Sequence, residues 1–502
     1  MKRQIVFSLV LVLGVALAAD QNGVSGPPLW GPANRIAPAA RARIRANLTK
    51  HALPGDAIHR WTTLALDANA LDHTPAEPSE ARVFGEQVGP GRTARAFAIA
   101  SIAIFEAANA IDTKYRSYTG LARAEQGTSI DAAVATAAHD ALRVLYPSQA
   151  ATFDAALNDD LRRLPGSAPV ERGVDLGHRA AASILTMRAG DHSSFPELSL
   201  GMGFTPGNQP GQWRMDPISM NMVALGVHWG DVNMFVLPSA ETFPQIPPPA
   251  LTSAEYAEAF DEVKRLGGDG ITTPTLRTAD QTEAGIFWGY DGTPGLGTPP
   301  RLYNQIVLQI ADEHRTTGVD LARLLALVNT ALADASIACW HQKYVYQFWR
   351  PVTGIREADA GTGPTGLGDG NPATSGDATF SPLGAPASNL TGPNVTPPFP
   401  SYASGHAAFG GTLFEMLRDV YGTDAIAFTF VSDEFNGLTL DHTGVVRPYR
   451  PRSFSSLSEA EEENGQSRIY LGIHWAFDKT TGISDGNQIA AYVFGHAFQA
   501  LK

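Results

Sequence analysis

Three stretches of this sequence combine residue types that could bind an anion and move a proton. In the last of them, Arg468 and His474 lie six positions apart, and Asp478 follows four positions later. Because positions i and i+4 share a helix face, Asp478 can hold one ring nitrogen of His474 and leave the other basic. Such a nitrogen suits a nucleophile or a metal ligand. Arg468 would lie about 120° off that face of a straight helix, so either Gly472 interrupts the helix or the arginine reaches in from the first turn.

The stretch from Trp340 to Pro351 supplies two more cations. Lys343 and Arg350 are seven positions apart, so they almost eclipse on a helix, and Trp340 falls on the same face. The residue before a proline avoids helical backbone, and we therefore predict that Arg350 ends this helix. Taken alone, either cation would be typical of a helix surface.

The third stretch, Phe399 to Glu415, runs from a proline-rich loop into an apolar helix. Ser404 is a typical N-cap for that helix. The backbone N–H groups of Ser404, Gly405 and His406 would then point at a ligand over the helix start, which favours an anion. His406 could supply a proton at this point, although alone it would fit a capped core histidine.

Together the three stretches provide the donors of a tetrahedral-oxyanion site. Their order, Lys-x6-Arg-Pro, Ser-Gly-His and Ser-Arg-x5-His-x3-Asp, resembles that of a superfamily containing the vanadium-dependent haloperoxidases, the type 2 phosphatidic acid phosphatases and the class A acid phosphatases. The resemblance implies an all-α fold of two helix bundles with long irregular connections. It also implies an active site in the C-terminal bundle.

In the haloperoxidase branch, the resemblance implies one vanadate per chain and no haem. His474 would be the metal ligand, and His406 would act as the acid and base. Lys343 would help to polarise the bound hydrogen peroxide. A halide, chloride or bromide, would then be oxidised to a hypohalous acid equivalent. The residues expected to bind the oxyanion are Lys343, Arg350, Ser404, Gly405 and Arg468.

In the phosphatase branch, the same groups would hydrolyse a phosphate ester. His474 would attack phosphorus to form a phosphohistidine, and His406 would protonate the leaving oxygen. Trp340 and Phe399 favour the haloperoxidase, because they match the residues that line the halide site of fungal chloroperoxidases. Bromoperoxidases of the algal kind carry histidine in place of this phenylalanine. A third interpretation, an exported anion-binding protein with a dead site, would need one histidine to be missing, and both are present.

Two aspartates are candidates for holding the site residues in place. Asp478 would orient His474, as described above. Asp291 lies in a Phe-Trp-Gly-Tyr-Asp-Gly segment, which is similar to one in fungal-type chloroperoxidases whose aspartate pairs with a site arginine. Here the partner would be Arg468 or Arg350. The alternative is an ordinary loop aspartate.

Composition limits the class of protein and its partners. The chain has 502 residues and a net charge of -13, which disfavours nucleic acid but allows a local cationic pocket. Its single cysteine, Cys339, cannot form an intramolecular disulfide and suits a buried core position. Hydrogen peroxide, a halide and an optional small organic acceptor are the expected partners, and the oligomeric state is not predicted.

Residues 1–18 read as a signal peptide, with a charged start, a short apolar run and a small-x-small end. We therefore expect a secreted or periplasmic protein, the alternative being an uncleaved N-terminal anchor. No stable membrane insertion is expected, because no later stretch approaches the apolar length needed to span a bilayer.

Two domains are predicted after the signal peptide, an N-terminal helical domain at 19–248 and a C-terminal helical bundle at 249–502 that carries the oxyanion site. Residues 26–63 predict a surface arm without chemistry. The glycine- and proline-rich residues 361–388 predict a flexible loop near the mouth of the site. Residues 445–456 form a basic segment that would steer anions or, more typically, be a solvated surface.

Overall fold

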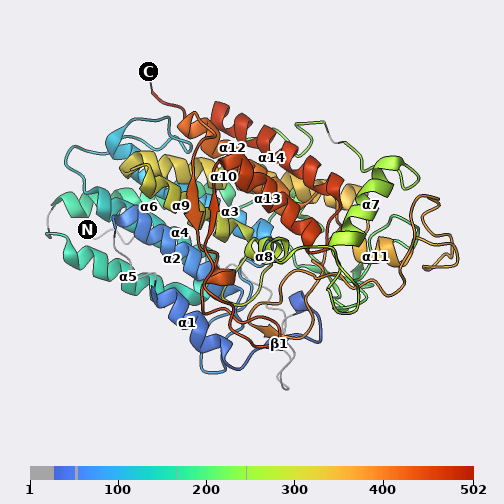
Figure 1. The fold of residues 1–502 in the computed structure, drawn as a ribbon. Coiled ribbons are helices and arrows are strands. Elements are labelled where there is room, and N and C mark those ends of the chain that lie inside the picture. Colours follow the sequence, from blue (N-terminus) through green and yellow to red (C-terminus); the bar gives the residue numbers. More distant parts are fainter. Residues whose placement is uncertain (1–27, 51–54, 167, 245, 502) are drawn as a thin grey trace.

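The computed structural model of the chain describes residues 28–50, 55–166, 168–244 and 246–501. The predicted signal peptide at residues 1–18 lies outside the described residues. The described chain is mainly helical (Figure 1), which confirms the all-α prediction. The first group of helices comprises α1 (Ala40–Lys50), α2 (Ala57–Asp72), α3 (Gly89–Asp112), α4 (Ile130–Leu145), α5 (Ala150–Arg163) and α6 (Ala168–Arg188).

The second group of helices follows a long connection. It comprises α7 (Ala254–Leu266), α8 (Ala279–Phe287), α9 (Pro299–Glu313), α10 (Gly318–Tyr346), α11 (Pro351–Arg356), α12 (Gly405–Tyr421), α13 (Leu457–Tyr470) and α14 (Ala476–His496). Short strands pair across the connections. They are β1 (Arg35–Ile36) with β5 (Leu390–Thr391), β2 (Leu198–Leu200) with β3 (Gly203–Phe204) and β4 (Val223–Ala224), and β6 (Phe428–Phe430) with β7 (Arg452–Phe454).

Small residues let the helices of the first group approach closely. Helix α3 is rich in alanine and buried along nearly its whole length, as an all-round apolar helix should be. On α6, a Cβ atom at Gly173 or Gly177 would lie 2.6 Å from the backbone oxygen of Ser129 or Ala133. These glycines therefore permit the contact of α6 with α4.

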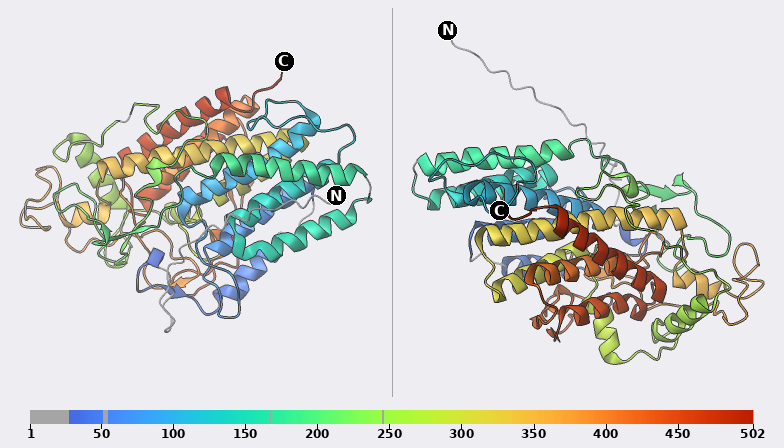
Figure 2. Two further views of the ribbon diagram at one scale, coloured as in Figure 1. Left: turned by 180° about the vertical axis from the view of Figure 1, so that it is seen from behind. Right: turned by 90° about the horizontal axis from the view of Figure 1, so that it is seen from above.

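Helix α10 is the member of the second group that faces the first (Figure 2). It packs against α3 on one side and against α12 and α14 on the other. Its sequence is a long run of leucine and alanine, both good helix formers. The closest packing in the second group joins α12 to α14, where Gly482 leaves room for the start of α12: a Cβ there would meet Ser404 O at 2.8 Å. This contact brings the N-termini of α12 and α14 together.

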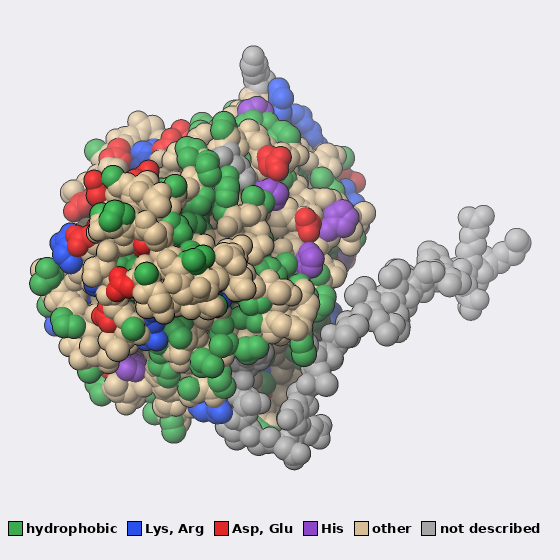
Figure 3. Space-filling model, turned by 90° about the vertical axis from the view of Figure 1, so that its right-hand side faces the viewer, with side chains coloured by type: hydrophobic (Ala, Val, Ile, Leu, Met, Phe, Trp, Pro, Cys, Tyr) green, Lys and Arg blue, Asp and Glu red, His purple; other side chains and the backbone are tan. Residues whose placement is uncertain are grey.

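The expectation that no later stretch resembles a membrane span was wrong. Helices α3 and α10 are both long and apolar enough to cross a membrane by length and composition. Most residues of both are buried within the protein, however, as in the core helices of soluble proteins. The described face at the right of Figure 1 shows mostly uncharged side chains with scattered acidic and basic groups (Figure 3).

Candidate active site

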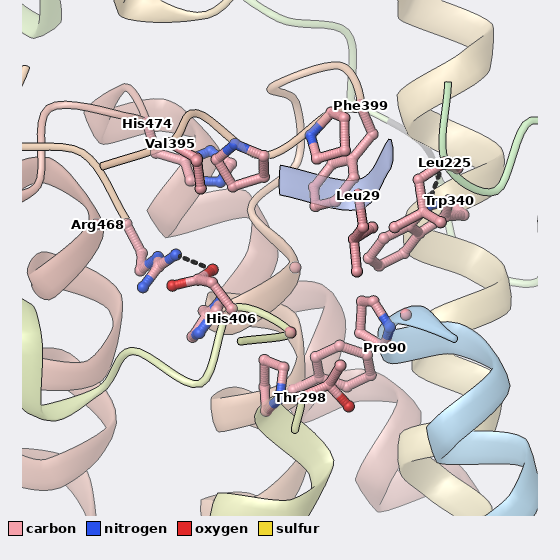
Figure 4. Close-up of a pocket in the computed structure, with 18 residues that line it drawn as sticks. Leu29, Pro90, Leu225, Thr298, Trp340, Val395, Phe399, His406, Arg468 and His474 are labelled. Carbon is pink, nitrogen blue, oxygen red and sulfur yellow. Dashed lines mark hydrogen bonds and ion pairs between the residues drawn. The ribbon is translucent and has the colours of Figure 1, made fainter. Parts of the chain in front are cut away.

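The main cavity near the predicted residues has one polar and one apolar side (Figure 4). Its volume of about 40 Å³ exceeds the roughly 10–15 Å³ that one water needs, so several waters or a small inorganic ion would fit. The polar lining consists of Asp291, Thr298, His406, Arg468 and His474, and the apolar lining includes Leu29, Pro90, Leu225, Trp340, Pro398 and Phe399. The cavity therefore draws on both halves of the chain.

Arg468 lies in the last turn of α13, with its side chain fully buried. Its Nη2 donates to Asp291 Oδ1 at 2.7 Å. The sequence left the partner of Asp291 open between two arginines, and the structure pairs it with Arg468. Among the described residues, Nε and Nη1 of Arg468 have no hydrogen-bond partner. Asp291 thus fixes one end of the guanidinium and leaves two donors for a ligand.

The prediction that Arg350 ends a long helix was wrong. Helix α10 ends at Tyr346, and Arg350 is the N-cap of the short helix α11. The correction has a simple cause, because Pro351 suits the first position of a new helix and forces extended backbone on the residue before it. Lys343 and Arg350 therefore reach the site from different elements.

The guanidinium of Arg350 is held against the two loops that carry site residues. Its Nε donates to Phe399 O at 3.0 Å, and Nη1 lies 2.9 Å from both Ile473 O and His474 Nε2. Nη2 has no partner in the described part of the chain. Burial lowers the pKa of Arg350 to about 9, and the negative charge of Asp478 only partly opposes this shift.

His474 is also outside a helix, in contrast to the expected shared helix face with Asp478. Helix α13 ends at Tyr470, and Gly472 adopts a positive φ of 72°, a conformation that glycine allows without steric cost. The expected pair still forms, since His474 Nδ1 donates to Asp478 Oδ2 at 2.7 Å from the first turn of α14. Gly472 thus provides the interruption that the sequence left open.

The Asp478 carboxylate fixes the tautomer of His474. Its Oδ2 also accepts the Ser401 hydroxyl and, at 3.1 Å, the N–H of Trp475. Burial raises the pKa of Asp478 to about 6, and the three donors on one oxygen oppose this shift and favour the ionised form. With Nδ1 protonated, the lone pair of His474 is on Nε2. Burial and the neighbouring cations, Arg350 first among them, lower the pKa of His474 well below its usual value. The imidazole is therefore neutral, and the lone pair on its Nε2 has the chemistry of a ligand or a nucleophile.

His406 lines the cavity at the start of α12. Its Nε2 lies 2.7 Å from Gly289 O, and because a carbonyl can only accept, this nitrogen carries a proton. Burial and Arg468 lower the pKa of His406 well below its usual value. The neutral ring then has a free lone pair on Nδ1, which can take up a proton and give it back.

Ser404 caps α12 as predicted, its hydroxyl accepting the N–H of Ala407 at 3.4 Å. The Ser404 N–H was predicted to point at a ligand. It donates to Asp478 O at 3.0 Å instead, so this N–H is not available to a ligand. The N–H groups of Gly405 and His406 belong to the first helical turn, where the helix itself offers no acceptor. Gly405 lines the cavity, whereas Ser404 does not.

Lys343 is buried beside the cavity without lining it. Its Nζ donates to three carbonyl oxygens, those of Pro400, Ser401 and Ala403, at 3.0, 2.9 and 2.5 Å. An ammonium has three donors, so in this arrangement none is left for an oxyanion. Burial lowers the pKa of Lys343 to about 7. Its contribution here is a nearby charge and the shape of the loop from 400 to 403.

The two predicted halide residues form the aromatic wall of the cavity. The ring centroids of Trp340 and Phe399 are 4.9 Å apart. The Nζ of Lys343 and the guanidinium carbon of Arg350 both lie 5.0 Å from the Phe399 ring. An apolar aromatic wall next to buried cations suits a weakly hydrated anion, which loses little hydration there and meets the partially positive ring edges.

Comparisons with known proteins point to one group. Residues 323–502 match the model of the VCPO second helical-bundle domain. A vanadium chloroperoxidase of Curvularia inaequalis is 39% identical over 269 residues, which are 46% of this chain and 42% of that protein. The chain thus matches less than half of that relative's length.

Solved structures extend the similarity to most of the chain. A bacterial vanadium-dependent iodoperoxidase superposes with a TM-score of 0.67 at 22% identity, covering 88% of this chain and 96% of the other. The fold is that of the vanadium haloperoxidases. A bacterial vanadium-dependent chloroperoxidase in its holo form has a TM-score of 0.60 at 15% identity, covering 85% and 97%. The resemblance indicated by the three sequence motifs is confirmed.

Within this vanadium haloperoxidase fold, the matched domain begins inside α10. The predicted boundary between 248 and 249 stays a prediction, because α10 packs against both groups of helices. Residues 361–388, predicted to lie at the mouth, contribute no residue to the cavity lining.

The basic segment from 445 to 456 contributes no residue to the cavity lining, and much of it, including Arg450, is exposed, as the solvated-surface alternative predicts. Arg447 is buried and bonded to Glu434, Arg450 pairs with Glu283 at 3.4 Å, and Arg452 pairs with Glu463 at 2.5 Å. The three arginines are engaged by carboxylates, so they tie this loop to its neighbours.

Sequence reasoning missed two sets of residues that shape the cavity. Ser401 donates to Asp478 and so supports His474, but it precedes the recognised Ser-Gly-His motif. Leu29, Pro90 and Leu225 line the apolar side, although the arm at 26–63 was expected to carry no chemistry. Only the tertiary fold brings these residues to the cavity, and no local pattern marks them.

Proposed function

We propose that the protein is a vanadium-dependent haloperoxidase, which oxidises chloride or bromide with hydrogen peroxide to a hypohalous acid equivalent. One observation carries the proposal. Arg468, whose Nε and Nη1 have no partner among the described residues, lines one cavity with His474 and the Trp340 and Phe399 wall. Arg350 lies behind His474, with Nη1 at 2.9 Å from Nε2 and with Nη2 unpartnered in the described chain. Buried cationic donors without acceptors are costly, so the site calls for a bound oxyanion.

The residues present fit vanadate. His474 Nε2 would be the ligand to the metal, with Arg350 Nη2 and Arg468 Nη1 and Nε available to its oxygens. The Gly405 N–H at the start of α12 is a further donor. When bound, vanadate would supply a Lewis acid that activates hydrogen peroxide toward a halide.

The side chains have separate tasks in this proposal. His406 holds and moves a proton at Nδ1, while Gly289 O stabilises the resulting imidazolium through Nε2. Asp478 keeps the proton of His474 on Nδ1, so that Nε2 carries the lone pair, which here accepts from Arg350 Nη1 and would be turned to the metal in the loaded protein. The charge of Lys343 lies close enough to favour anions in the cavity without contacting them.

The apolar side supports a halide in preference to an alkyl phosphate. The Trp340 N–H is already bonded to Leu225 O, so Trp340 and Phe399 present apolar rings to the cavity, and their partially positive edges and the nearby guanidinium groups suit a monovalent anion. The phosphohistidine route uses the same histidines, and no contact in the described chain favours it over halide oxidation. The export of the chain, its organic acceptor and its oligomeric state stay predictions.

The test is a paired assay on one purified sample, with and without added vanadate. We expect bromination or chlorination of a diketone dye by hydrogen peroxide only when vanadate is present, and we expect His474→Ala to lower it by at least about 100-fold. Hydrolysis of p-nitrophenyl phosphate is measured in parallel.

The matched control is His228→Ala, since His228 is an exposed loop histidine that lines no part of the cavity. This variant should halogenate at the rate of the unaltered protein. Phosphate release without any halogenation in the presence of vanadate would contradict the proposal and favour the phosphatase branch.

A further inference from the structure

The methionines of this chain are unevenly distributed. Five of its eight methionines lie between residues 202 and 234. Three of these five, Met202, Met220 and Met222, are 77%, 46% and 48% exposed. Methionine is usually a buried residue, as Met416 is here at 0%. Three exposed thioethers in one short region are therefore unusual and require a reason.

Met220 and Met222 flank residues that build the rim of the cavity. Between them, the Asn221 amide donates to Leu29 O at 2.6 Å, and Leu29 lines the cavity. Three residues after Met222, the N–H of Leu225 donates to Pro398 O at 2.9 Å, and both of these residues line the cavity too. Three residues span at most about 10 Å of chain, so Met222 lies close to the rim.

Met202 belongs to the same surface. It follows β2, whose Leu200 donates its N–H to Met222 O at 2.7 Å, and Met202 O accepts the N–H of Ser199. The small sheet of β2, β3 and β4 thus joins the exposed thioethers of Met202, Met220 and Met222, which we call the methionine rim.

We propose that the methionine rim is an oxidation site that takes up hypohalous acid as it leaves the cavity. The inference rests on the proposed haloperoxidase function, which supplies the oxidant. A thioether sulfur attacks the halogen of HOX, and the halogen–oxygen bond breaks to release hydroxide. Water then attacks the halosulfonium and displaces the halide with loss of two protons, one of which the hydroxide takes up. The products are methionine sulfoxide, one halide ion and one proton, with sulfur oxidised and the halogen reduced by two electrons each.

The rim would protect the site from its own product. The exposed sulfurs are separated from the core, so the polar sulfoxide disturbs no packing there. By contrast, Trp340 and Cys339, whose side chains can also be oxidised, are buried next to the cavity. A sacrificial site at the exit lowers the amount of oxidant that can return to them.

The experiment compares two sources of the same oxidant. The vanadate-loaded protein is supplied with hydrogen peroxide and bromide, and a second sample without peroxide receives hypobromite from bulk solution to the same total. Peptide mass spectrometry then measures sulfoxide at each position. Met187 is the internal reference, because it is 52% exposed on α6, a helix that contributes no residue to the cavity lining.

With oxidant made in the cavity, we expect sulfoxide at Met220 and Met222 to exceed that at Met187 by at least about fivefold, because the thioethers nearest the source react first. With hypobromite from bulk solution, the three positions should be oxidised about equally, since their exposure is similar. If Met220 and Met222 were oxidised no more than Met187 with either source, the proposal would be overturned. Bromination of a dye in the same tube would in that case still support the enzyme function. Absence of dye bromination would overturn both.

A second measurement tests the protective role. The variant Met202→Leu, Met220→Leu, Met222→Leu keeps the apolar volume and removes the sulfurs, and its initial bromination rate should equal that of the unaltered protein. We expect it to be inactivated at least about twice as fast during turnover. Met187→Leu is the matched control and should not change the rate of inactivation. Equal inactivation of all three proteins would contradict the protective role.

Discussion

The two sides of the cavity are built in different ways. On the polar side, Arg468 and His474 are each oriented by a carboxylate, and the groups come only from the segments between 289 and 478. The apolar side is held by packing and includes Leu29 and Leu225 from the N-terminal half. Oriented hydrogen bonds specify which atom faces a ligand, whereas packing specifies only shape. Changes on the polar side should therefore abolish binding, and changes on the apolar side should alter selectivity.

The largest effect should follow the loss of Arg468. Arg468→Met removes two buried donors that have no partner among the described residues. At roughly 1.5–3 kcal/mol per charge-assisted bond, we expect orthovanadate or phosphate to bind about 100-fold more weakly by isothermal calorimetry. Asp291→Asn leaves the cation but loosens it, and should weaken binding by about tenfold.

Arg450→Met provides the control for Arg468, because Arg450 is half exposed and pairs with Glu283 away from the cavity. Its oxyanion affinity should not change. If Arg468→Met bound phosphate as tightly as the unaltered protein, the polar side would not be the anion site.

The next effect is on the dependence of binding on pH. The pKa of Lys343 is lowered to about 7 by burial, so Lys343 is a cation below this pH and neutral above it. Sulfate, whose charge is constant here, should bind more weakly as pH rises through this value, by up to about tenfold per unit. The histidines do not contribute, since burial keeps the pKa of both His406 and His474 well below the usual value.

Calorimetric titrations with sulfate on both sides of this pKa check the prediction. In Lys343→Met the slope should disappear, and Lys264→Met, a variant on the surface of α7, should keep it. A slope that persists without Lys343 would assign the titration to another group.

Much of the polar side could be predicted from sequence because its residues lie in short ordered motifs. The cap at Ser404 and the contact of His474 with Asp478 follow from local spacing. The pairing of Asp291 with Arg468 was anticipated by its segment, although not its choice of arginine. The helices themselves follow from apolar periodicity and from long alanine- and leucine-rich runs.

The remainder depends on contacts between distant segments. The three carbonyl acceptors of Lys343 arise from the path of a loop that no periodic pattern predicts. The predicted position of Arg350 at the end of a helix was wrong, because a proline can begin a helix as well as end one. Leu29 reaches the cavity from nearly 450 positions before His474 in the chain, and only folding brings them together.

A smaller effect is expected on the apolar side. Phe399→His replaces an apolar ring 4.9 Å from Trp340 with a polar one. We expect the rate with chloride to fall about tenfold relative to bromide, because a hydrated imidazole disfavours the less readily oxidised halide. Steady-state rates with each halide give the ratio.

Phe399→Leu is the control, since it keeps the apolar surface, and its chloride-to-bromide ratio should stay within about twofold. If Phe399→His instead abolished vanadate binding, the division between an anion-binding side and a selectivity side would not hold.

The smallest effect should come from Ser401, which contacts the site only through Asp478. Ser401→Ala removes one hydrogen bond worth about 1 kcal/mol, so we expect about a fivefold lower halogenation rate at saturating peroxide and halide. Ser401→Thr, which keeps the hydroxyl, should restore the rate. A rate that Thr fails to restore would indicate a packing role for this residue.

The most direct test of the account is a crystal structure of the protein with orthovanadate. The account predicts vanadium within bonding distance of His474 Nε2, with its oxygens on the free donors of Arg350 and Arg468. Vanadate bound elsewhere, or a His474 ring whose Nε2 still accepts from Arg350 while the anion lies apart, would contradict it.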